Sequence, residues 1–345
     1  MIEELGLVVI GRNEGDRLKK CLLSIREQAN YIVYVDSGST DDSVAIASSL
    51  GVDVVALDMC LPFTAGCARN EGFFYLVHKY PQLELVQFVD GDCQIVPGWL
   101  VTARKTLITQ DKIAIVCGRR RERFSDKSIY NRLCDLEWNT PVGEAKACGG
   151  DFMVRAAAFA RVRGFNPSLI AGEEPELCIR LRQQGWKILR IDADMTLHDA
   201  RMFHWNQWWK RALRGGYAYA EGSWLYSKTP ERHWVKESKS IWFWGLILPL
   251  ILLALLLPTH GLSLGLTALY AIAIYRVFLR LQRQALKPQD ALSYAIHCIL
   301  SKFPQAQGQI QFHFNRLTGK RQNIIEYNNL KYSSSSITPT TILDR

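Results

Sequence analysis

The chain has 345 residues, of which 48% are hydrophobic, so it can bury a substantial core, and a disordered or collagen-like chain is excluded. Its 42 Lys and Arg residues outnumber 33 Asp and Glu residues, and the formal charge of +9 indicates an anionic partner: nucleic acid, lipid headgroups or a phosphorylated small molecule. The nine cysteines include no C-x-x-C pair, which favours reduced thiols in a cytosolic setting over a disulfide framework or a zinc site.

Strand and helix patterns alternate through the first hundred residues. Apolar residues spaced i, i+3, i+4 and i+7 between positions 18 and 25 predict an amphipathic helix. Ser39 and Asp42 fit a capping box for a second helix, which runs to Leu50 and is stopped by Gly51. A third helix is expected over 64–79, and strands are expected over 5–10, 31–35, 52–57 and 85–89.

This alternation predicts an α/β fold with a mostly parallel sheet and helices on both of its faces. Ligands of such sheets bind beyond the carboxyl ends of the strands, where Asp36 and Asp90 are expected. The pattern becomes mixed α+β from about 100 to 235 with no linker, so we expect one catalytic domain over 1–235.

Two apolar runs follow, at about 241–257 and 262–279, and each is about 25 Å long as a helix, at the short limit for crossing a bilayer. Their outer flanks are basic and the link between them is uncharged, which predicts a transmembrane hairpin over 236–282 with both ends in the cytoplasm. The competing interpretation is a buried hairpin of a soluble protein. An amphipathic segment broken by Pro304 is expected over 283–332, either in the membrane interface or packed on the domain, and a disordered tail over 333–345.

Asp90-Gly91-Asp92, directly after an apolar strand, is the strongest local signal. Two carboxylates at a strand end, separated by glycine, are suited to hold a hard divalent cation together with a diphosphate. The competing interpretation is an ordinary acidic turn. Neither a dinucleotide-binding fingerprint nor a P-loop is present in the sequence.

Four motifs in order resemble those of the family 2 glycosyltransferases, which bind nucleotide sugars with a GT-A fold, and specifically the membrane-anchored bacterial type. They are I-G-R-N-E at 10–14, V-D-S-G-S-T-D at 35–41, C-A-R-N at 67–70 and D-G-D at 90–92.

The resemblance implies a role for each matching residue. Asp36 corresponds to the acidic contact to the base, Asp90 to the ribose or diphosphate contact, and Asp92 to the ligand of Mn²⁺ or Mg²⁺. Arg69 would face the phosphates, and a guanidinium suits phosphate geometry. The nucleotide-sugar site implied by the turns also includes Gly11, Arg12, Asn13, Glu14, Gly38 and Ser39. Asp36 also fits a simple turn cap, and Arg69 a surface ion pair.

Glu173, Glu174 and Pro175 begin a predicted helix that runs to Gln184. Pro175 suits the first helical position, which places Glu174 near the N-cap, where the helix dipole favours its ionised form. An ionised carboxylate beside a sugar acceptor is a candidate general base. The family usually has E-D or D-D here, so the sequence leaves open whether Glu173 or Glu174 is the base. Acidic residues are also common in a first helical turn.

Three further segments have less specific interpretations. His198 fits a third metal ligand, as in some related transferases, or an ordinary histidine. Residues 207–211 (Q-W-W-K-R) lack the Arg-Trp order of processive synthases, so their aromatic residues fit an acceptor shelf, a membrane contact or plain packing. The run 119–123 (R-R-R-E-R) fits a lipid phosphate, acidic headgroups or solvent, and no nucleic-acid-binding motif accompanies it.

The sequence therefore predicts a metal-dependent, inverting glycosyltransferase in the inner (cytoplasmic) membrane, multi-pass and with its catalytic domain in the cytoplasm. Its expected partners are a nucleotide-diphosphate sugar, a lipid-linked or saccharide acceptor and the membrane, but no nucleic acid. The expected pathway is cell-envelope or exopolysaccharide biosynthesis. The alternatives are a catalytically silent membrane subunit that scaffolds a polysaccharide-assembly complex, and a nucleotidyltransferase, which would release pyrophosphate.

Overall fold

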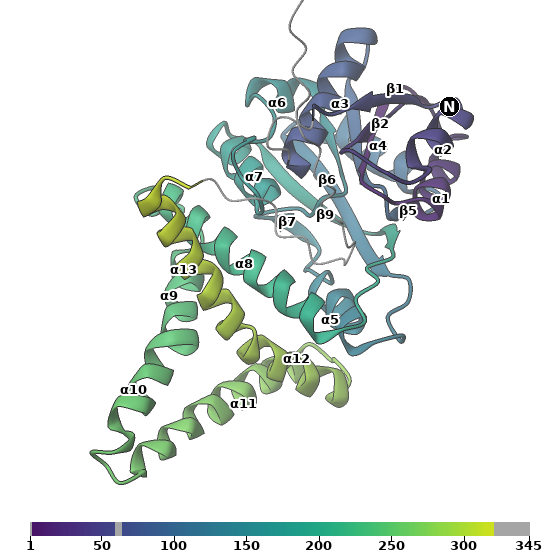
Figure 1. The fold of residues 1–345 in the computed structure, drawn as a ribbon. Coiled ribbons are helices and arrows are strands. Elements are labelled where there is room, and N and C mark those ends of the chain that lie inside the picture. The colour runs from purple at the N-terminus through teal and green to yellow at the C-terminus, as the bar shows by residue number, and fades with distance from the viewer. Residues whose placement is uncertain (1, 59–63, 321–345) are drawn as a thin grey trace, which may run out of the picture.

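The computed structural model describes residues 2–58 and 64–320, so the predicted tail over 333–345 lies outside the described residues. A globular α/β domain carries a helical projection at one end (Figure 1). The strands that the structure describes are β1 (Ile2–Gly11), β2 (Ala29–Asp36), β3 (Asp53–Ala56), β4 (Leu85–Asp90), β5 (Cys93–Ile95), β6 (Ile113–Glu122), β7 (Gly143–Ala145), β8 (Phe152–Arg155) and β9 (Lys187–His198).

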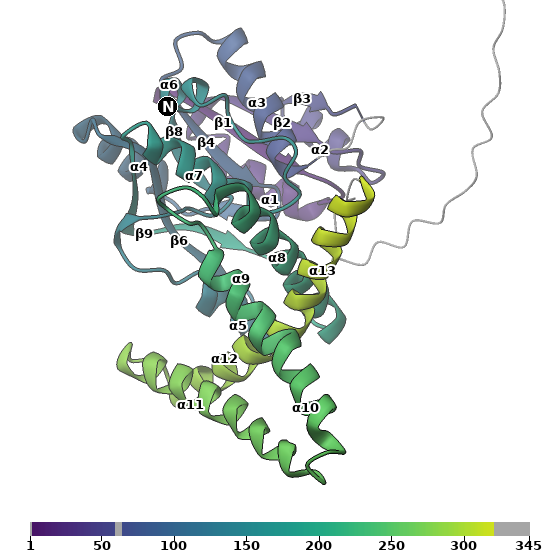
Figure 2. The ribbon, with the colours of Figure 1, turned by 90° about the vertical axis from the view of Figure 1, so that its left-hand side faces the viewer.

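The helices cover the faces of the sheet and form the projection (Figures 1 and 2). They are α1 (Asp16–Ile25), α2 (Ser43–Ser49), α3 (Ala65–Lys79), α4 (Trp99–Thr109), α5 (Ile129–Glu137), α6 (Ala156–Arg161), α7 (Glu173–Gln183), α8 (Trp205–Tyr226), α9 (Val235–Trp242), the π-helical turn η1 (Phe243–Ile247), α10 (Leu248–Leu256), the 3₁₀ segment η2 (Leu262–Thr267), α11 (Ala268–Arg283), α12 (Pro288–Leu300) and α13 (Lys302–Thr318).

The described strands form one sheet in the order β3-β2-β1-β4-β8-β6-β9-β5, with β7 paired to β9. The pairs among β1, β2, β3 and β4 are parallel, as the sequence predicts. Antiparallel pairs begin with β8, which lies between β4 and β6, so the whole sheet is mixed. This insertion brings residues from the second half of the domain beside the carboxyl end of β4.

Two helix starts differ from the sequence-based prediction. The Ser39/Asp42 capping box is wrong: α2 begins at Ser43, whose N–H donates to the Asp41 carboxylate at 3.0 Å, while Asp42 makes no capping hydrogen bond. Helix α7 begins at Glu173, so Pro175 is its third residue, and the N-cap is Gly172. Gly172 has φ of 81°, a left-handed conformation that glycine adopts without strain.

The segment after the hairpin packs on the domain through α13, which resolves one of the alternatives left open by the sequence. The helical segment is interrupted at Ser301, between α12 and α13. Pro304 lies in the first turn of α13, where its missing N–H costs little. Helices α8 and α13 lie side by side (Figures 1 and 2). A Cβ atom at Gly216 would lie 2.1 Å from the carbonyl oxygen of Gln305, so the two backbones touch.

The two apolar helices project away from the globular domain (Figure 1). They span Val235–Leu256 and Leu262–Arg283, about 33 Å each, and are longer than the predicted runs. Only 11% and 6% of their most apolar stretches are buried, which does not fit the core hairpin of a soluble protein. Both are long and apolar enough to cross a membrane.

Candidate active site

Asp90 is the centre of an ion-pair network at the carboxyl end of β4. Its Oδ1 accepts from Nη2 of Arg69 at 2.8 Å and its Oδ2 from Nη2 of Arg120 at 2.9 Å. Arg120 also pairs with Asp151 at 2.8 Å, and Asp151 accepts from the backbone N–H of Asp90 at 3.0 Å. Burial alone would raise the pKa of Asp90, but the two guanidinium groups hold it below its ordinary value. Asp90 is therefore held ionised and in a fixed orientation.

Asp92 and His198 lie together, as their proposed shared role as metal ligands requires. Oδ2 of Asp92 is 3.2 Å from Nε2 of His198, and Nδ1 of His198 is 3.3 Å from Oε2 of the buried Glu122. A carboxylate on one ring nitrogen leaves the other directed to the metal side, which is the usual arrangement behind a metal-binding histidine. Carboxylate oxygen and imidazole nitrogen form a donor set that fits Mn²⁺, so the residues present fit the metal.

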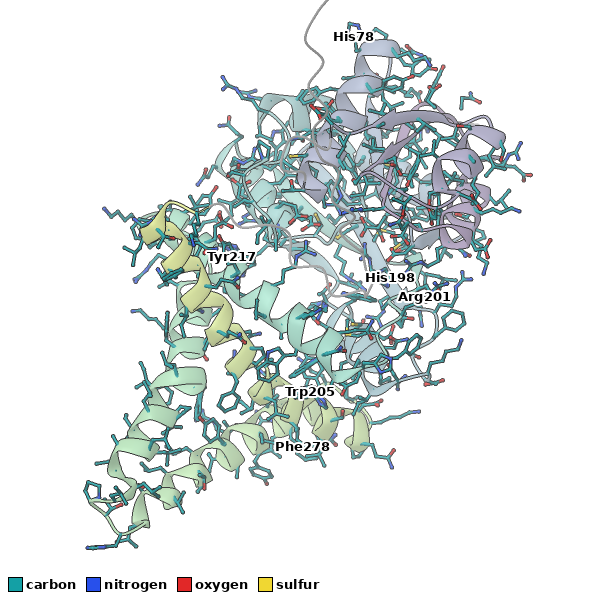
Figure 3. All side chains as sticks on the ribbon, in the orientation of Figure 1. His78, His198, Arg201, Trp205, Tyr217 and Phe278 are labelled. Atoms are coloured by element: carbon teal, nitrogen blue, oxygen red, sulfur yellow. The ribbon has the colours of Figure 1, made fainter. Side chains whose placement is uncertain are left out.

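Burial would lower the pKa of His198, but Asp92 and Glu122 raise it to about 9. Burial would raise the pKa of Asp92, but His198 and Arg17 hold it well below its ordinary value. His198 lies at the end of β9, close to Arg201 in the chain that leads to α8 (Figure 3). Without metal the two side chains form an ion pair, and a bound cation would displace the histidine proton.

Glu173 and Glu174 both reach Arg69 from the first turn of α7. Nη1 of Arg69 is 3.3 Å from Oε1 of Glu173 and 3.0 Å from Oε1 of Glu174. Arg69 therefore connects these glutamates to Asp90. Burial would lower the pKa of Arg69, but the three carboxylates raise it above its ordinary value. Burial, together with the charge of Glu173, raises the pKa of Glu174 to about 7.

The turns after β1 and β2 hold each other in place. Oδ1 of Asn13 accepts from the backbone N–H of Thr40 at 2.7 Å, and Oγ of Ser39 accepts from the backbone N–H of Asn13 at 2.9 Å. Asp36 accepts from the hydroxyl of Tyr34 at 2.8 Å and from the N–H groups of Gly38 and Ser39 at 3.0 and 2.8 Å. Asp36 therefore does cap its turn, and it lies at the sheet edge where the sequence places it.

Gly11 ends β1 and pairs with Asp36 in register, and Arg12 follows in the turn. The backbone N–H of Glu14 donates to Oγ of Ser43 at 3.1 Å. Burial and the charge of Asp92 raise the pKa of the Glu14 carboxyl to about 8. The first turn thus lies between the carboxyl ends of β2 and β4, where the other predicted nucleotide-site residues lie.

The basic run 119–123 is not a continuous surface patch, because Arg121 is its only exposed residue. It forms the end of β6, whose side chains alternate between two faces. Arg120 and Glu122 face the site, whereas Arg119 and Arg121 pair with Asp135 and Asp194.

Sequence reasoning also missed Asp151 and Gly150. Asp151 is fully buried and accepts from the hydroxyl of Thr196 at 2.7 Å. A Cβ atom at Gly150 would lie 2.4 Å from Nη2 of Arg69, so this backbone packs directly on the Arg69–Asp90 ion pair. The sequence offered one signal, the Gly149-Gly150-Asp151 triplet before an apolar strand.

A cavity of about 560 Å³ extends from Arg120, Glu173 and Glu174 to helices α8, α12 and α13. Trp208 lines it and packs against Trp205, which lies at the start of α8 (Figure 3), with the two rings tilted and their centroids 4.6 Å apart. Gln207 instead caps α8, since its Oε1 accepts from the N–H groups of Phe203 and His204. Trp209 contacts α13 by donating to Gln307 at 3.2 Å. Of the aromatic pair, only Trp208 is in the place expected of an acceptor shelf.

Comparison with known proteins finds a family model that matches the first part of the domain and a solved structure with a similar fold. Residues 7–156 match the model of the glycosyl transferase family 2. An O-antigen chain rhamnosyltransferase of Salmonella typhimurium is 22% identical over 213 residues, which are 56% of this chain and 66% of that protein. A TPR repeat-containing protein of Synechococcus elongatus is 26% identical over 139 residues, 40% of this chain and 32% of that protein. The chain thus spans between a third and two thirds of these relatives.

One solved structure resembles almost the whole chain. It is a mannosyltransferase of Pyrobaculum calidifontis in complex with GDP-mannose and Mn²⁺, with 16% identity, a TM-score of 0.60, and coverage of 89% of this chain and 87% of that one. At this identity the similarity establishes the fold, which is the GT-A fold expected from the motifs.

Proposed function

We propose that this chain, whose residues 7–156 match the model of the glycosyl transferase family 2, moves a sugar from a nucleotide-diphosphate sugar to a hydroxyl group of a membrane-associated acceptor, with inversion at the anomeric carbon. One observation carries the proposal: Arg69 joins Asp90, beside the Asp92–His198 pair, to the two glutamates of α7. A candidate leaving-group site and a candidate base are therefore held by one buried side chain.

On the donor side, the turn from Gly11 to Glu14 and the turn of Asp36, Gly38 and Ser39 would hold the nucleoside, and Asp90 with Arg69 the ribose and phosphates. Asp92 and His198 would hold Mn²⁺ or Mg²⁺, which neutralises charge on the departing diphosphate when bound. The solved mannosyltransferase with GDP-mannose and Mn²⁺ supports this assignment by its fold.

On the acceptor side, Glu174 would take the proton of the attacking hydroxyl. The oxygen of the acceptor hydroxyl then bonds to the anomeric carbon while the bond from that carbon to the diphosphate oxygen breaks. A carboxyl with a pKa of about 7 suits this task, because a base near the working pH combines availability with basicity. Glu173, which is more deeply buried, would position Arg69 and hold the pKa of Glu174 up.

The projecting hairpin supports a membrane-associated acceptor, a polyprenyl-linked saccharide or a glycolipid of cell-envelope or exopolysaccharide biosynthesis. Large apolar side chains are exposed along it, such as Leu253 at 67% and Leu257 at 85%. A patch of this kind fits a lipid environment. With basic flanks at both outer ends, the catalytic domain would lie in the cytoplasm against the inner membrane.

The test is a transfer assay with purified full-length protein, a membrane lipid extract and a panel of sugar-labelled nucleotide sugars, with Mn²⁺. We expect label in the lipid fraction and release of a nucleoside diphosphate, both abolished in Asp92→Asn. No transfer and no donor hydrolysis with any sugar would instead favour a silent scaffolding subunit, and release of pyrophosphate a nucleotidyltransferase.

A further inference from the structure

The cavity of about 560 Å³ is lined by both acidic and basic side chains. Glu173 and Glu174 line it from α7, and Ser301, Lys302 and Gln305 line it from the junction of α12 and α13. A ligand in this cavity would therefore extend from the candidate base toward the helices that lead out of the hairpin. Neither Asp36 nor Asp92 lines the cavity, but Arg120, which pairs with Asp90, does, so the cavity adjoins the nucleotide side of the site.

Among the described residues, two cations that line the cavity form no ion pair with a carboxylate. Of the arginines that line it, Arg120 pairs with Asp90 and Asp151, and Arg211 pairs with Glu137 at 2.8 Å. Arg214 donates only to the carbonyl oxygen of Ile170, at 3.1 Å, and within residues 2–58 and 64–320 neither Arg214 nor Lys302 forms an ion pair with a carboxylate.

Lys302 is largely removed from water, and this burial lowers its pKa below its ordinary value although the charge of Glu237, which forms no ion pair with it, acts in the opposite direction. Partly buried cations are normally paired with an anion, so the part of the cavity beside Lys302 and Arg214 fits an anionic ligand.

Lys302 contacts the first projecting helix, Val235–Leu256, near the point where its charge-free part begins. A Cβ atom at Gly245 would lie 2.1 Å from the carbonyl oxygen of Lys302, so the backbones of η1 and α13 touch there. Trp242 and Trp244 lie just before Gly245, and tryptophans concentrate at the membrane–water boundary of spanning helices. The helix is π-helical at this contact, over Phe243–Ile247. Lys302 is thus at the level where lipid headgroups would lie.

We propose that this cavity binds the phosphate group of a lipid-linked acceptor, held by Lys302 and Arg214, while the sugar hydroxyl of that acceptor extends to Glu174. The inference rests on the proposed function and adds to it the charge of the acceptor and the residues that recognise it. A neutral glycolipid would leave both cations unpaired, whereas a phosphate neutralises them and forms charge-assisted hydrogen bonds.

Binding is measured on full-length protein in detergent by thermal shift, with farnesyl phosphate as the probe and farnesol and inorganic phosphate as comparisons. We expect farnesyl phosphate to stabilise the protein more than either of them. Equal stabilisation by farnesol would overturn the phosphate assignment, and equal stabilisation by inorganic phosphate would overturn the lipid source.

Variants locate the site. Lys302→Met and Arg214→Gln are each expected to weaken farnesyl phosphate binding about ten- to hundredfold, the usual effect of losing a charge-assisted hydrogen bond. Lys210→Met makes the same lysine change at an exposed position of α8, away from the cavity, and is expected to bind as the native protein does. Native-like binding by both Lys302→Met and Arg214→Gln would overturn the proposal.

A cavity-filling variant provides a second, independent test. Gly215 lines the cavity, and a Cβ atom there would have no atom within 4 Å, so Gly215→Leu places its side chain in open space on a helix that tolerates leucine. We expect this variant to fold, to lose farnesyl phosphate binding and to keep donor binding. Unchanged farnesyl phosphate binding in it would contradict the proposed location.

The binding measurements do not depend on catalysis, so the two proposals fail separately. Cavity-dependent farnesyl phosphate binding without any sugar transfer would refute the proposed function alone. Sugar transfer to lipid with native KM for the acceptor in Lys302→Met and Arg214→Gln would refute the cavity proposal alone.

Discussion

Glu173 and Glu174 are adjacent and both contact Arg69, but their exposure differs. The side chain of Glu173 is 5% exposed and that of Glu174 is 16% exposed, so only Glu174 has appreciable access to an acceptor. Because burial and the charge of Glu173 raise the pKa of Glu174 to about 7, Glu174 is partly protonated at neutral pH. A base acts only when deprotonated, so we expect kcat/KM to fall about tenfold per pH unit below 7 and to level off above it.

Substitution separates the two roles. We predict that Glu174→Gln lowers kcat by about 10²- to 10⁴-fold, the usual contribution of a general base. Glu173→Gln removes a like charge beside Glu174, so it should retain more activity and move the midpoint of the pH profile to lower pH. The measurement is kcat and kcat/KM against pH in the presence of Mn²⁺, with the midpoint taken from kcat/KM. A larger loss in Glu173→Gln than in Glu174→Gln would reverse the assignment.

The residues that the sequence placed correctly follow from local patterns. Asp36, Asp90 and Asp92 come directly after apolar strands, and parallel strands bring such ends to one edge of the sheet. Arg120, Glu122 and Asp151 join them only because β8 and β6 enter the sheet beside β4, a long-range pairing that no local pattern encodes. The charge of the run 119–123 predicts a surface cluster, whereas in the structure its side chains alternate between the two faces of β6.

At the scale of elements, the contact between α8 and α13 depends on two glycines. A Cβ atom at Gly216 would lie 2.1 Å from the Gln305 oxygen, and one at Gly308 would lie 2.1 Å from the Leu213 oxygen. We predict that Gly216→Ala destabilises the protein by about 1–3 kcal/mol, because the backbones must separate. Gly215→Ala is the matched control on the same helix, and should stabilise by up to about 1 kcal/mol.

Chemical denaturation in detergent would measure both variants. Equal stability of Gly216→Ala and Gly215→Ala would show that the close approach of the two backbones contributes little to folding.

The sequence predicts which helices are present in the first hundred residues, but it predicts the residues at which helices begin less accurately. Buried side chains at 18, 21, 22 and 25 confirm the first amphipathic helix, and Gly51 with φ of 72° follows α2 as expected. The start of α7 was placed too late because Pro175 also fits a third helical position, and Gly172 supplies the left-handed N-cap. Pro304 is likewise the third residue of α13, although the sequence predicts that it interrupts the amphipathic segment.

At the scale of the whole molecule, the +9 charge separates into two sets of residues. Arg69 is buried and Arg120 is half-buried against the carboxylates of the site, whereas the basic residues that flank the hairpin are not part of the site. We predict a hairpin with both ends in the cytoplasm and the 258–261 link on the opposite side of the membrane. A reporter active only outside the cytoplasm should give signal in the link and none at either terminus.

Carbonate washing of membranes provides the control for that topology. Two spanning helices should keep the full-length protein in the membrane fraction, whereas an interfacial attachment by charge should be released. Release by carbonate, or reporter signal at a terminus, would contradict the hairpin.

The central claim is that the strand-end carboxylates bind a nucleotide-diphosphate sugar together with a divalent cation. The most direct test is thermal unfolding of purified full-length protein with UDP-, GDP- and dTDP-sugars, with and without Mn²⁺, in the native protein and in Asp92→Asn. A ligand that binds only the folded state at 100 times its Kd adds about 2.7 kcal/mol of stability. We predict such stabilisation by one donor class, only with Mn²⁺ and only in the native protein. Stabilisation by no nucleotide sugar, or stabilisation unaffected by Mn²⁺ removal and by Asp92→Asn, would contradict the account.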